Sequence, residues 1–263
     1  MDSGVGGLTV VREVLRQLPQ EQIVYFGDTA RAPYGPRPPE EVVRFTREIA
    51  EYLTRYQPKM LVLACNTATA VALDDIRSRV EIPVVGVIKP GARAAVKASR
   101  TGRIGVIGTE GTVKSGAYEE ALREISAQLE IVSLACPDLV PLVEAGEYES
   151  PRAWETVRRS LAPLQDQKLD SLILGCTHYP FLAAPIAEAM GPSTQLINSA
   201  EETVREISAI LSYQGDLAKR EDGTPLHRFF CSGDSAIFRR ITSSWLNQQV
   251  EANTIVWQVP TVG

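Results

Sequence analysis

The sequence predicts an α/β protein with two similar doubly wound lobes, parallel sheets and an active site in the cleft between the lobes. Three observations support this fold class. The sequence contains short, uninterrupted runs of valine, isoleucine and leucine. Helical patterns alternate with these runs, and the order strand, cysteine, helix occurs twice. Continuous apolar strands that alternate with helices are typical of a parallel sheet covered on both faces. Ligands of such open sheets bind beyond the carboxyl ends of the strands.

The expected elements follow from the positions of these runs. Strands are expected at residues 23–26, 60–64, 83–87, 104–107, 129–134, 171–174 and 195–197. Helices are expected at residues 8–18, 39–56, 69–80, 92–98, 117–127, 153–164, 181–190 and 201–213. Toward the C-terminus, HRFFCSG predicts a strand and a turn, residues 236–245 a helix, and VWQVP a last strand.

The repeated order lies in LVLACNTATAVAL (61–73) and LILGCTHYPFLAA (172–184). Two similar halves that each place a cysteine where a strand ends favour two related lobes that face one cleft. The alternative is that strand–helix units resemble one another in general. We expect a first lobe formed by residues 1–89 and 200–263, which carries Cys65. The second lobe, residues 90–199, would carry Cys176.

Charge and composition exclude several classes of function. The 263 residues carry a net charge of −5, which argues against a nucleic-acid partner because phosphate neutralisation needs a basic face. The N-terminal MDSGVGG lacks the basic and apolar regions of a signal peptide, and the longest apolar run is too short to span a bilayer. We therefore expect a cytoplasmic protein with free cysteines and no membrane association. The two histidines lack metal-ligand spacing, so no metal site is predicted.

Two of the four cysteines stand where a strand ends and a helix is expected to begin. Cys65 and Cys176 have this position, whereas Cys136 and Cys231 are interpreted as small buried hydrophobic residues. A thiol near a helix N-terminus lies close to unpaired N–H groups and the positive end of the helix dipole. We therefore expect the pKa of these two thiols to lie below the ordinary value.

Two facing thiols suit a reaction that inverts a stereocentre. One base removes a proton from one face, and a second acid returns a proton to the opposite face. Thiol and thiolate are both accessible near neutral pH, and such a pair titrates as a coupled unit. The C-x₅-R loop of phosphatases is absent, since Val71 and Leu182 stand six residues after the two cysteines. A symmetric pair of Cys–His nucleophiles also fails, because only Cys176 has a histidine beside it.

Other polar residues allow a structural interpretation. Asp28 is read as a turn cap, Glu144 as part of a solvated helix face, and the Gly6-Gly7 pair as a tight turn. The GVGG run is not a dinucleotide fingerprint and no Walker loop is present, so the indication of a nucleotide site is weak.

Five blocks together resemble the glutamate racemase family of the aspartate/glutamate racemase superfamily: DSGVGGLTV, GDTARAPYG, ACNTATA, GVIGTEGTVKSGAY and LILGCTHYP. The resemblance covers nearly the whole chain. It implies a homodimeric enzyme with no cofactor that interconverts L- and D-glutamate and supplies D-glutamate for peptidoglycan. It also implies that Cys65 removes the α-proton of D-glutamate and Cys176 that of L-glutamate.

The resemblance assigns the remaining site residues. Asp2 would assist Cys65 and hold the substrate ammonium, while Glu144 and His178 would assist Cys176. The implied substrate contacts are Asp2, Ser3, Tyr34, Gly35, Asn66, Thr67, Thr109, Thr112, Thr177 and His178.

One feature departs from the family pattern. An apolar first strand precedes the D-S-G turn in the family, whereas only Met1 precedes Asp2 in this sequence. We expect Asp2 to fray, stability to be reduced and the Cys65 half of the site to be weakened. An added apolar strand of about five or six residues should raise activity.

Three other functions remain open from the residues. A racemase or isomerase of aspartate or another diacid would use the same pair of thiols. A non-catalytic amino-acid-binding protein would bind without turnover. A pyridoxal phosphate enzyme would need Lys89 or Lys114, both near expected loops, where lysine is usually solvated.

Overall fold

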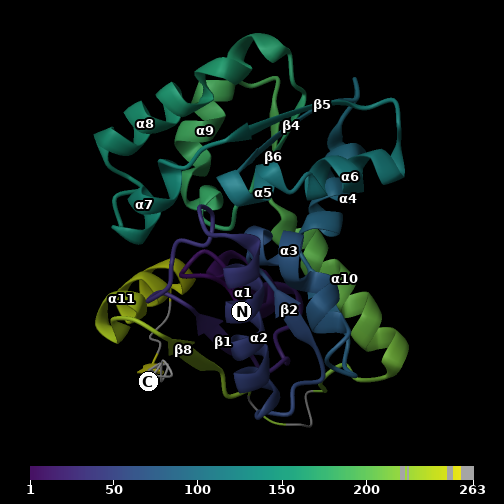
Figure 1. Cartoon of the computed structure of the whole chain (residues 1–263), viewed down its shortest axis with the longest axis vertical. Coiled ribbons are helices and arrows are strands. Elements are labelled where there is room, and N and C mark those ends of the chain that lie inside the picture. The colour runs from purple at the N-terminus through teal and green to yellow at the C-terminus, as the bar shows by residue number, and fades with distance from the viewer. Residues whose placement is uncertain (220–222, 224, 248–250, 256–263) are drawn as a thin grey trace.

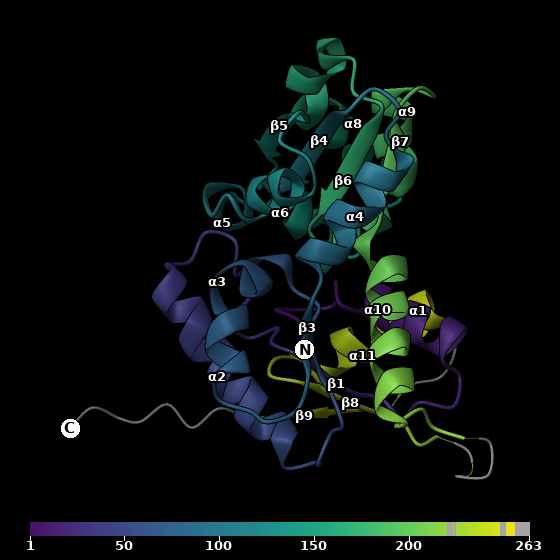
Figure 2. The same ribbon diagram turned by 90° about the vertical axis from the view of Figure 1, so that its right-hand side faces the viewer.

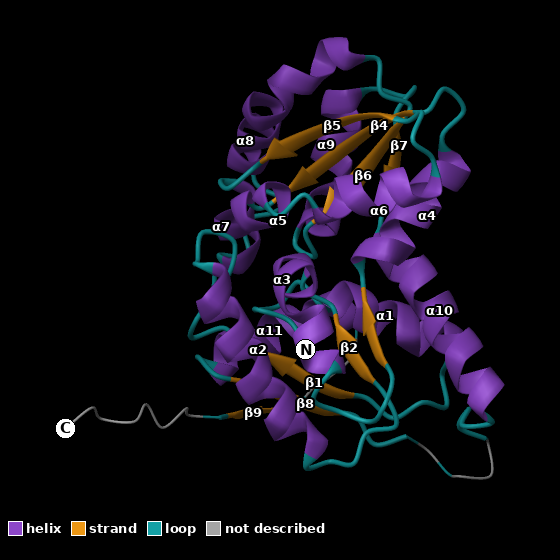
Figure 3. Cartoon of the chain, turned by 45° about the vertical axis from the view of Figure 1, so that its right-hand side comes forward, coloured by secondary structure: helices purple, strands orange, loops and turns teal. Residues whose placement is uncertain are grey.

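The computed structural model describes residues 1–219, 223, 225–247 and 251–255 as two lobes stacked along the long axis of the molecule (Figure 1). The strands form a lower and an upper group (Figure 3). The lower group contains the sheet β1-β8-β9 and the pair β2-β3, and the upper group is the sheet β5-β4-β6-β7. The strands are β1 (Val24–Gly27), β2 (Leu61–Leu63), β3 (Val84–Gly86), β4 (Arg103–Gly108), β5 (Glu130–Ala135), β6 (Ser171–Gly175), β7 (Gln195–Ile197), β8 (Arg228–Cys231) and β9 (Ala252–Thr254).

All pairings among these strands are parallel, which confirms the predicted fold class. The helices are α1 (Leu8–Gln17), α2 (Pro39–Thr54), α3 (Asn66–Arg77), α4 (Ile88–Ala98), α5 (Glu110–Lys114), α6 (Ala117–Ile125), α7 (Leu139–Glu144), α8 (Pro151–Leu161), α9 (Ala183–Met190), α10 (Ser199–Gln214) and α11 (Ser235–Leu246). Short 3₁₀ helices cover Ala162–Gln167 and Tyr179–Leu182. No helix in the described part of the chain is long and apolar enough to cross a membrane.

The elements agree with the sequence expectations apart from their ends, two short helices and the last strand. Neither α5 nor α7 was expected, because helices of five and six residues carry little periodicity. The helix expected at 181–190 is a 3₁₀ turn followed by α9, since Pro180 and Pro185 interrupt one continuous helix. The last strand expected in VWQVP, residues 256–260, lies outside the described residues. The strand β9, which ends two residues before that segment, was not expected.

Apolar residues at helical spacing explain how the helices cover the sheets. In α2, Pro39 occupies the first turn together with two glutamates, a favourable start for a helix. Val42, Phe45, Ile49 and Leu53 of α2 are buried on one face and belong to a core that includes β1 and β2 residues. This face of α2 therefore packs against β1 and β2.

Two helices join the lobes. The chain leaves β3 through α4 into the upper lobe and returns after β7 through α10, which runs along the lower lobe (Figure 2). Arg93 of α4 and Glu206 of α10 form an ion pair. The division into residues 1–89 with 200–263 and residues 90–199 stays a prediction. Both of its boundaries fall within two residues of a helix start, at Ile88 and at Ser199.

Met1 and Asp2 lie between β1 and β2 and link the two sheets of the lower lobe. The Asp2 N–H donates to the Phe26 carbonyl at 2.9 Å, and the Asp28 N–H donates to the Asp2 carbonyl at 3.0 Å. On the other side, the Ala64 N–H donates to the Met1 carbonyl at 3.0 Å. Asp2 is fully buried, so the expectation that it frays is wrong. Backbone hydrogen bonds hold Asp2 on the β1 side, and the bond to the Met1 carbonyl holds the preceding residue on the β2 side.

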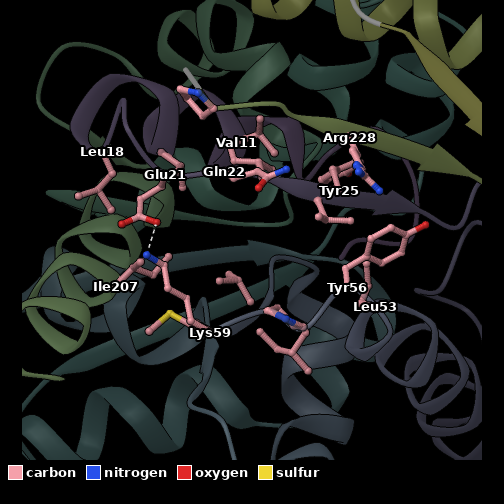
Figure 4. A pocket seen from close by; sticks show the side chains of 18 of the residues that line it. Val11, Leu18, Glu21, Gln22, Tyr25, Leu53, Tyr56, Lys59, Ile207 and Arg228 are labelled. Carbon is pink, nitrogen blue, oxygen red and sulfur yellow. Dashed lines mark ion pairs between the residues drawn. The ribbon is translucent and has the colours of Figure 1, made fainter. Parts of the chain in front are cut away.

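A cavity of about 720 Å³ is lined by Met1 and by residues of β1 and β2. Figure 4 shows side chains around it, among them Tyr25 and Lys59. Its lining is mainly apolar and includes Val11 of α1, Leu53 of α2 and Ile207 of α10. Lys59 and Glu21 form an ion pair of 2.7 Å at its wall. An extended apolar chain would therefore meet apolar side chains on both of its faces, as the strands of a covered parallel sheet do.

We predict that four valines added ahead of Met1 will continue the strand into this cavity. Each valine side chain that becomes buried should contribute about 1.5 kcal/mol or more, so the melting temperature should rise by roughly 5 °C or more. Thermal unfolding monitored by circular dichroism would measure the change. A Gly-Ser extension of the same length is the control, and an equal effect of both extensions would contradict the prediction.

Candidate active site

Cys65 follows β2 after one intervening residue, Ala64, and is the N-cap of α3. Its Sγ accepts a hydrogen bond from the Ala68 N–H at 3.5 Å and lies 3.7 Å from the Ser3 Oγ. The expected lowering of its pKa is wrong: burial, and then the charge of Asp2, raise the pKa of the Cys65 thiol to about 11. The hydrogen bonds from Ala68 and Ser3 act in the opposite direction but are outweighed. Cys65 is therefore a strong base once its proton has been removed.

Cys176 follows the last residue of β6 and is also buried. It does not cap an α-helix, because the 3₁₀ turn begins only at Tyr179. Its Sγ lies 3.6 Å from Nδ1 of His178, whose Nε2 contacts Oε1 of Glu144 at 2.5 Å. The two thiols therefore have different partners: a carboxylate raises the pKa of Cys65, and an imidazole lies beside Cys176.

The Glu144–His178 pair is largely enclosed. Burial acts to lower the pKa of His178, but the hydrogen bonds and charges of Cys176 and Glu144 outweigh it and raise that pKa well above its usual value. For Glu144, burial acts to raise the pKa, and the hydrogen bond and charge of His178 outweigh it and lower the pKa. The Val5 N–H also donates to Glu144 Oε1 at 3.4 Å. The reading of Glu144 as part of a solvated helix face is wrong, because this carboxylate joins α7 of the upper lobe to the N-terminal turn.

Asp2 and Thr177 connect the two halves of the site. The Thr177 hydroxyl donates to Oδ2 of Asp2 at 2.9 Å, and the Gly4 N–H donates to Oδ1 at 3.0 Å. Thr177 stands between Cys176 and His178 in the sequence, whereas Asp2 lies beside Cys65 in space. The hydrogen bond between Thr177 and Asp2 therefore links the residues around Cys176 to those around Cys65.

Three threonine hydroxyls form a second connection between the lobes. Thr67 Oγ1 lies 2.9 Å from Thr109 Oγ1 and 3.2 Å from Thr112 Oγ1, and the last two are 3.0 Å apart. The Gly111 N–H donates to the Gly35 carbonyl at 2.8 Å nearby. Glu144 apart, every residue predicted for the site is buried: Asp2, Ser3, Tyr34, Gly35, Cys65, Asn66, Thr67, Thr109, Thr112, Cys176, Thr177 and His178.

Tyr34 lies in the expected region, but its hydroxyl is already engaged. It donates to Oδ2 of Asp28 at 2.5 Å, so this side chain anchors the loop and places Gly35 beside Gly111. Asp28 also accepts from Arg31 Nε at 2.7 Å and from the Ser232 hydroxyl at 2.6 Å. The turn-cap reading of Asp28 missed this role, because Ser232 is distant in the sequence and no local pattern points to it.

The glycines of the N-terminal turn permit the close approach of the lobes. A methyl group on Gly6 would overlap the Thr177 hydroxyl and lie 2.7 Å from Nδ1 of His178. A methyl group on Gly4 would overlap the Glu144 carboxylate. The interpretation of GVGG as a plain tight turn is therefore incomplete.

Two other kinds of candidate site are a lysine for pyridoxal phosphate and a cluster of metal ligands. Lys89 pairs with Glu124 at 2.8 Å and Lys114 with Glu110 at 3.4 Å, and all four side chains are exposed. The described residues contain no group of three or more His, Cys, Asp or Glu side chains placed to hold a metal ion.

We predict that Asp28→Asn lowers the free energy of unfolding by about 3 kcal/mol, because it removes the charged acceptor of the hydrogen bonds from Arg31, Tyr34 and Ser232. Arg31 keeps its ion pair with Glu48 in this variant. Urea denaturation would measure the loss. Asp74→Asn is the control, since Asp74 is exposed beside Arg77 and such surface pairs contribute about 1 kcal/mol or less. Equal losses in the two variants would contradict the role of Asp28.

We predict that Glu144→Gln lowers stability in a pH-dependent way. Because the pKa of Glu144 is lowered in the folded protein, its ionisation stabilises the fold at pH values above its ordinary pKa, about 4.3. This stabilisation is lost as pH falls through the pKa of Glu144 in the folded state. Because the pKa of His178 is raised in the folded protein, its protonation stabilises the fold fully below about pH 6.5. This stabilisation is lost as pH rises through the pKa of His178 in the folded state. The stability difference should be largest, about 2 kcal/mol, between roughly pH 4.5 and 6.5.

Urea unfolding midpoints of both proteins from pH 3 to pH 9 would test this window. Glu41→Gln, which alters the partly exposed pair with Arg37, is the control. A stability difference between wild type and Glu144→Gln that does not vary with pH would rule out the ion pair.

Comparisons with known proteins agree with this geometry. The chain is 56% identical over 247 residues to a glutamate racemase of Listeria innocua. The matched region covers 94% of this chain and 92% of that protein. The structure of glutamate racemase RacE1 from Bacillus anthracis has a TM-score of 0.92 and 47% identity, covering 97% of this chain and 95% of that chain. A Francisella tularensis glutamate racemase solved with D-glutamate has a TM-score of 0.89 and 29% identity, with 97% and 95% covered. The family model described as Asp/Glu/Hydantoin racemase matches residues 4–207, so the chain belongs to that family.

Proposed function

We propose that this chain is a glutamate racemase that uses Cys65 and Cys176 as a pair of acid–base groups. The observation that carries the proposal is the placement of two buried thiols after strands of different lobes, each with its own ionisable partners. The identities above, to proteins named glutamate racemase, support glutamate as the substrate. The relative solved with D-glutamate supports the same choice.

In the direction from D- to L-glutamate, the reaction starts with Cys65 as thiolate and Cys176 as thiol. The Cys65 thiolate accepts the α-proton, and the electron pair of the C–H bond remains on the α-carbon. The Cys176 thiol then donates its proton to the opposite face of that carbon, which inverts it. Cys65 ends as thiol and Cys176 as thiolate, so charge and protons balance. The reverse direction exchanges the two roles.

The raised pKa of Cys65 leaves little of its thiolate near neutral pH but makes that thiolate a stronger base. An α-proton of an amino acid is weakly acidic, so a base of high pKa is better matched to it than a base of low pKa. Burial and the charge of Asp2 supply that basicity at Cys65. At Cys176, the His178 imidazole lies within 3.6 Å and can stabilise the thiolate that forms there, while Glu144 holds the imidazole from its other nitrogen.

Hydrogen-bonding groups around the thiols would hold the substrate. The proposed contacts come from Asp2, Ser3, Gly35, Asn66, Thr67, Thr109, Thr112, Thr177 and His178, and Tyr34 supports its loop. The Asp2 carboxylate would receive the substrate ammonium, and hydroxyl and amide donors would bind the two substrate carboxylates. Both proton transfers are assigned to the thiols, so the proposal includes no cofactor.

We further propose a cytoplasmic homodimer whose D-glutamate serves peptidoglycan synthesis, as the family resemblance implies. The four cysteines are all free, which supports a reducing compartment. Light scattering during size-exclusion chromatography would give the oligomeric state.

We predict that Cys65→Ala and Cys176→Ala each reduce racemisation at least about 10³-fold in both directions, because either face then lacks its proton carrier. Purified protein would be incubated with L- or D-glutamate in heavy water, with α-deuterium followed by NMR and enantiomers by chiral separation. Cys231→Ala is the control, since this buried thiol lies in β8. Wild-type rates retained in either test variant would overturn the two-thiol scheme.

A further inference from the structure

Asn66 follows Cys65 and begins α3, and only one end of its buried amide is engaged. Its Oδ1 accepts a hydrogen bond from the Tyr118 hydroxyl at 2.7 Å. Its Nδ2 has no hydrogen-bond partner within the described residues. Leaving a buried amide donor unpaired costs free energy, so such a group in a reaction site is suited to an acceptor that arrives with the ligand.

Tyr118 comes from the opposite lobe, where it lies in α6 and is only 2% exposed. Its ring is enclosed by two glycines. A methyl group on Gly91 of α4 would lie 3.1 Å from the Tyr118 hydroxyl, and one on Gly175 of β6 would lie 3.0 Å from the ring. Because Gly175 directly precedes Cys176, the tyrosine is held against the strand that carries the second thiol.

The Tyr118 hydroxyl also has a hydrogen bond with the Ser199 side chain, at the start of α10. Burial raises the pKa of Tyr118 above its ordinary value, so the hydroxyl keeps its proton and remains a donor to Asn66. The Tyr118 hydroxyl therefore lies between Ser199 and Asn66: it accepts a hydrogen bond from Ser199 and donates one to Asn66.

We propose that Tyr118 is a positioning residue that fixes the orientation of the Asn66 amide, so that Nδ2 rather than Oδ1 is available to a substrate carboxylate. A rotated amide would present its oxygen to an anion and repel it. The tyrosine therefore acts across the junction of the lobes, and only through Asn66. This inference rests on the proposed racemase function, because it takes a dicarboxylate as the ligand.

The test is a double-mutant cycle with Tyr118→Phe, Asn66→Ala and the double variant. Binding of D-glutamate would be measured by calorimetry and turnover by chiral separation. Tyr118→Phe should raise Kd and KM about 10-fold while kcat changes less, as expected for the loss of one hydrogen bond to a charged ligand. In the Asn66→Ala background, Tyr118→Phe should have no further effect.

Tyr52→Phe is the matched control, because the Tyr52 hydroxyl of α2 forms a hydrogen bond of 3.0 Å with Tyr56, which follows that helix. This variant should leave Kd unchanged. Ser199→Ala is the second variant if the phenylalanine variant does not fold; it should raise Kd about 3-fold, and only when Asn66 is present. Additive effects in either cycle, or an unchanged Kd in Tyr118→Phe, would overturn the inference. A wild-type protein that binds but does not racemise glutamate would instead contradict the proposed function alone.

Discussion

The hydrogen bond from the Thr177 hydroxyl to the Asp2 carboxylate is the interaction on which the site depends. Asp2 lies between β1 and β2 in the lower lobe, and Thr177 directly follows Cys176 after the end of β6 in the upper lobe. Both groups are buried, so the bond forms only when the lobes are in contact. The glycines at positions 4 and 6 are required by the same contact, because larger residues there would hold the lobes apart.

The two cysteines have different neighbours although their sequence surroundings look alike. Each follows a short apolar strand and precedes polar residues. Only Cys65 caps an α-helix, and the cost of burying its thiolate near Asp2 outweighs the helix N–H groups. Cys176 instead lies beside an imidazole that a carboxylate holds in place. The resemblance between the two segments therefore predicted the positions of the thiols but not their electrostatic environments.

Most of the fold could be predicted from the sequence, because continuous apolar runs and 3.6-residue periodicity are local signals. The short helices α5 and α7 were missed for lack of periodicity, and α7 carries Glu144, so its role was visible only through resemblance. The network around Asp28 could not be predicted, since it joins a turn after β1 to Ser232 after β8. The backbone bonds of Met1 and Asp2 were missed for a similar reason: a terminal position suggests mobility, whereas the neighbours that prevent it come from distant strands.

The triangle of Thr67, Thr109 and Thr112 has a consequence for a substrate that exists in two mirror-image forms. Each hydroxyl can donate or accept, so the three bonds can run around the ring in either sense with similar energy. A carboxylate that accepts from one hydroxyl removes that donor from the ring, and the remaining two can reorient without moving any heavy atom. If these threonines contact the substrate as proposed, both enantiomers meet the same set of oxygen atoms, with only the hydroxyl hydrogens reoriented.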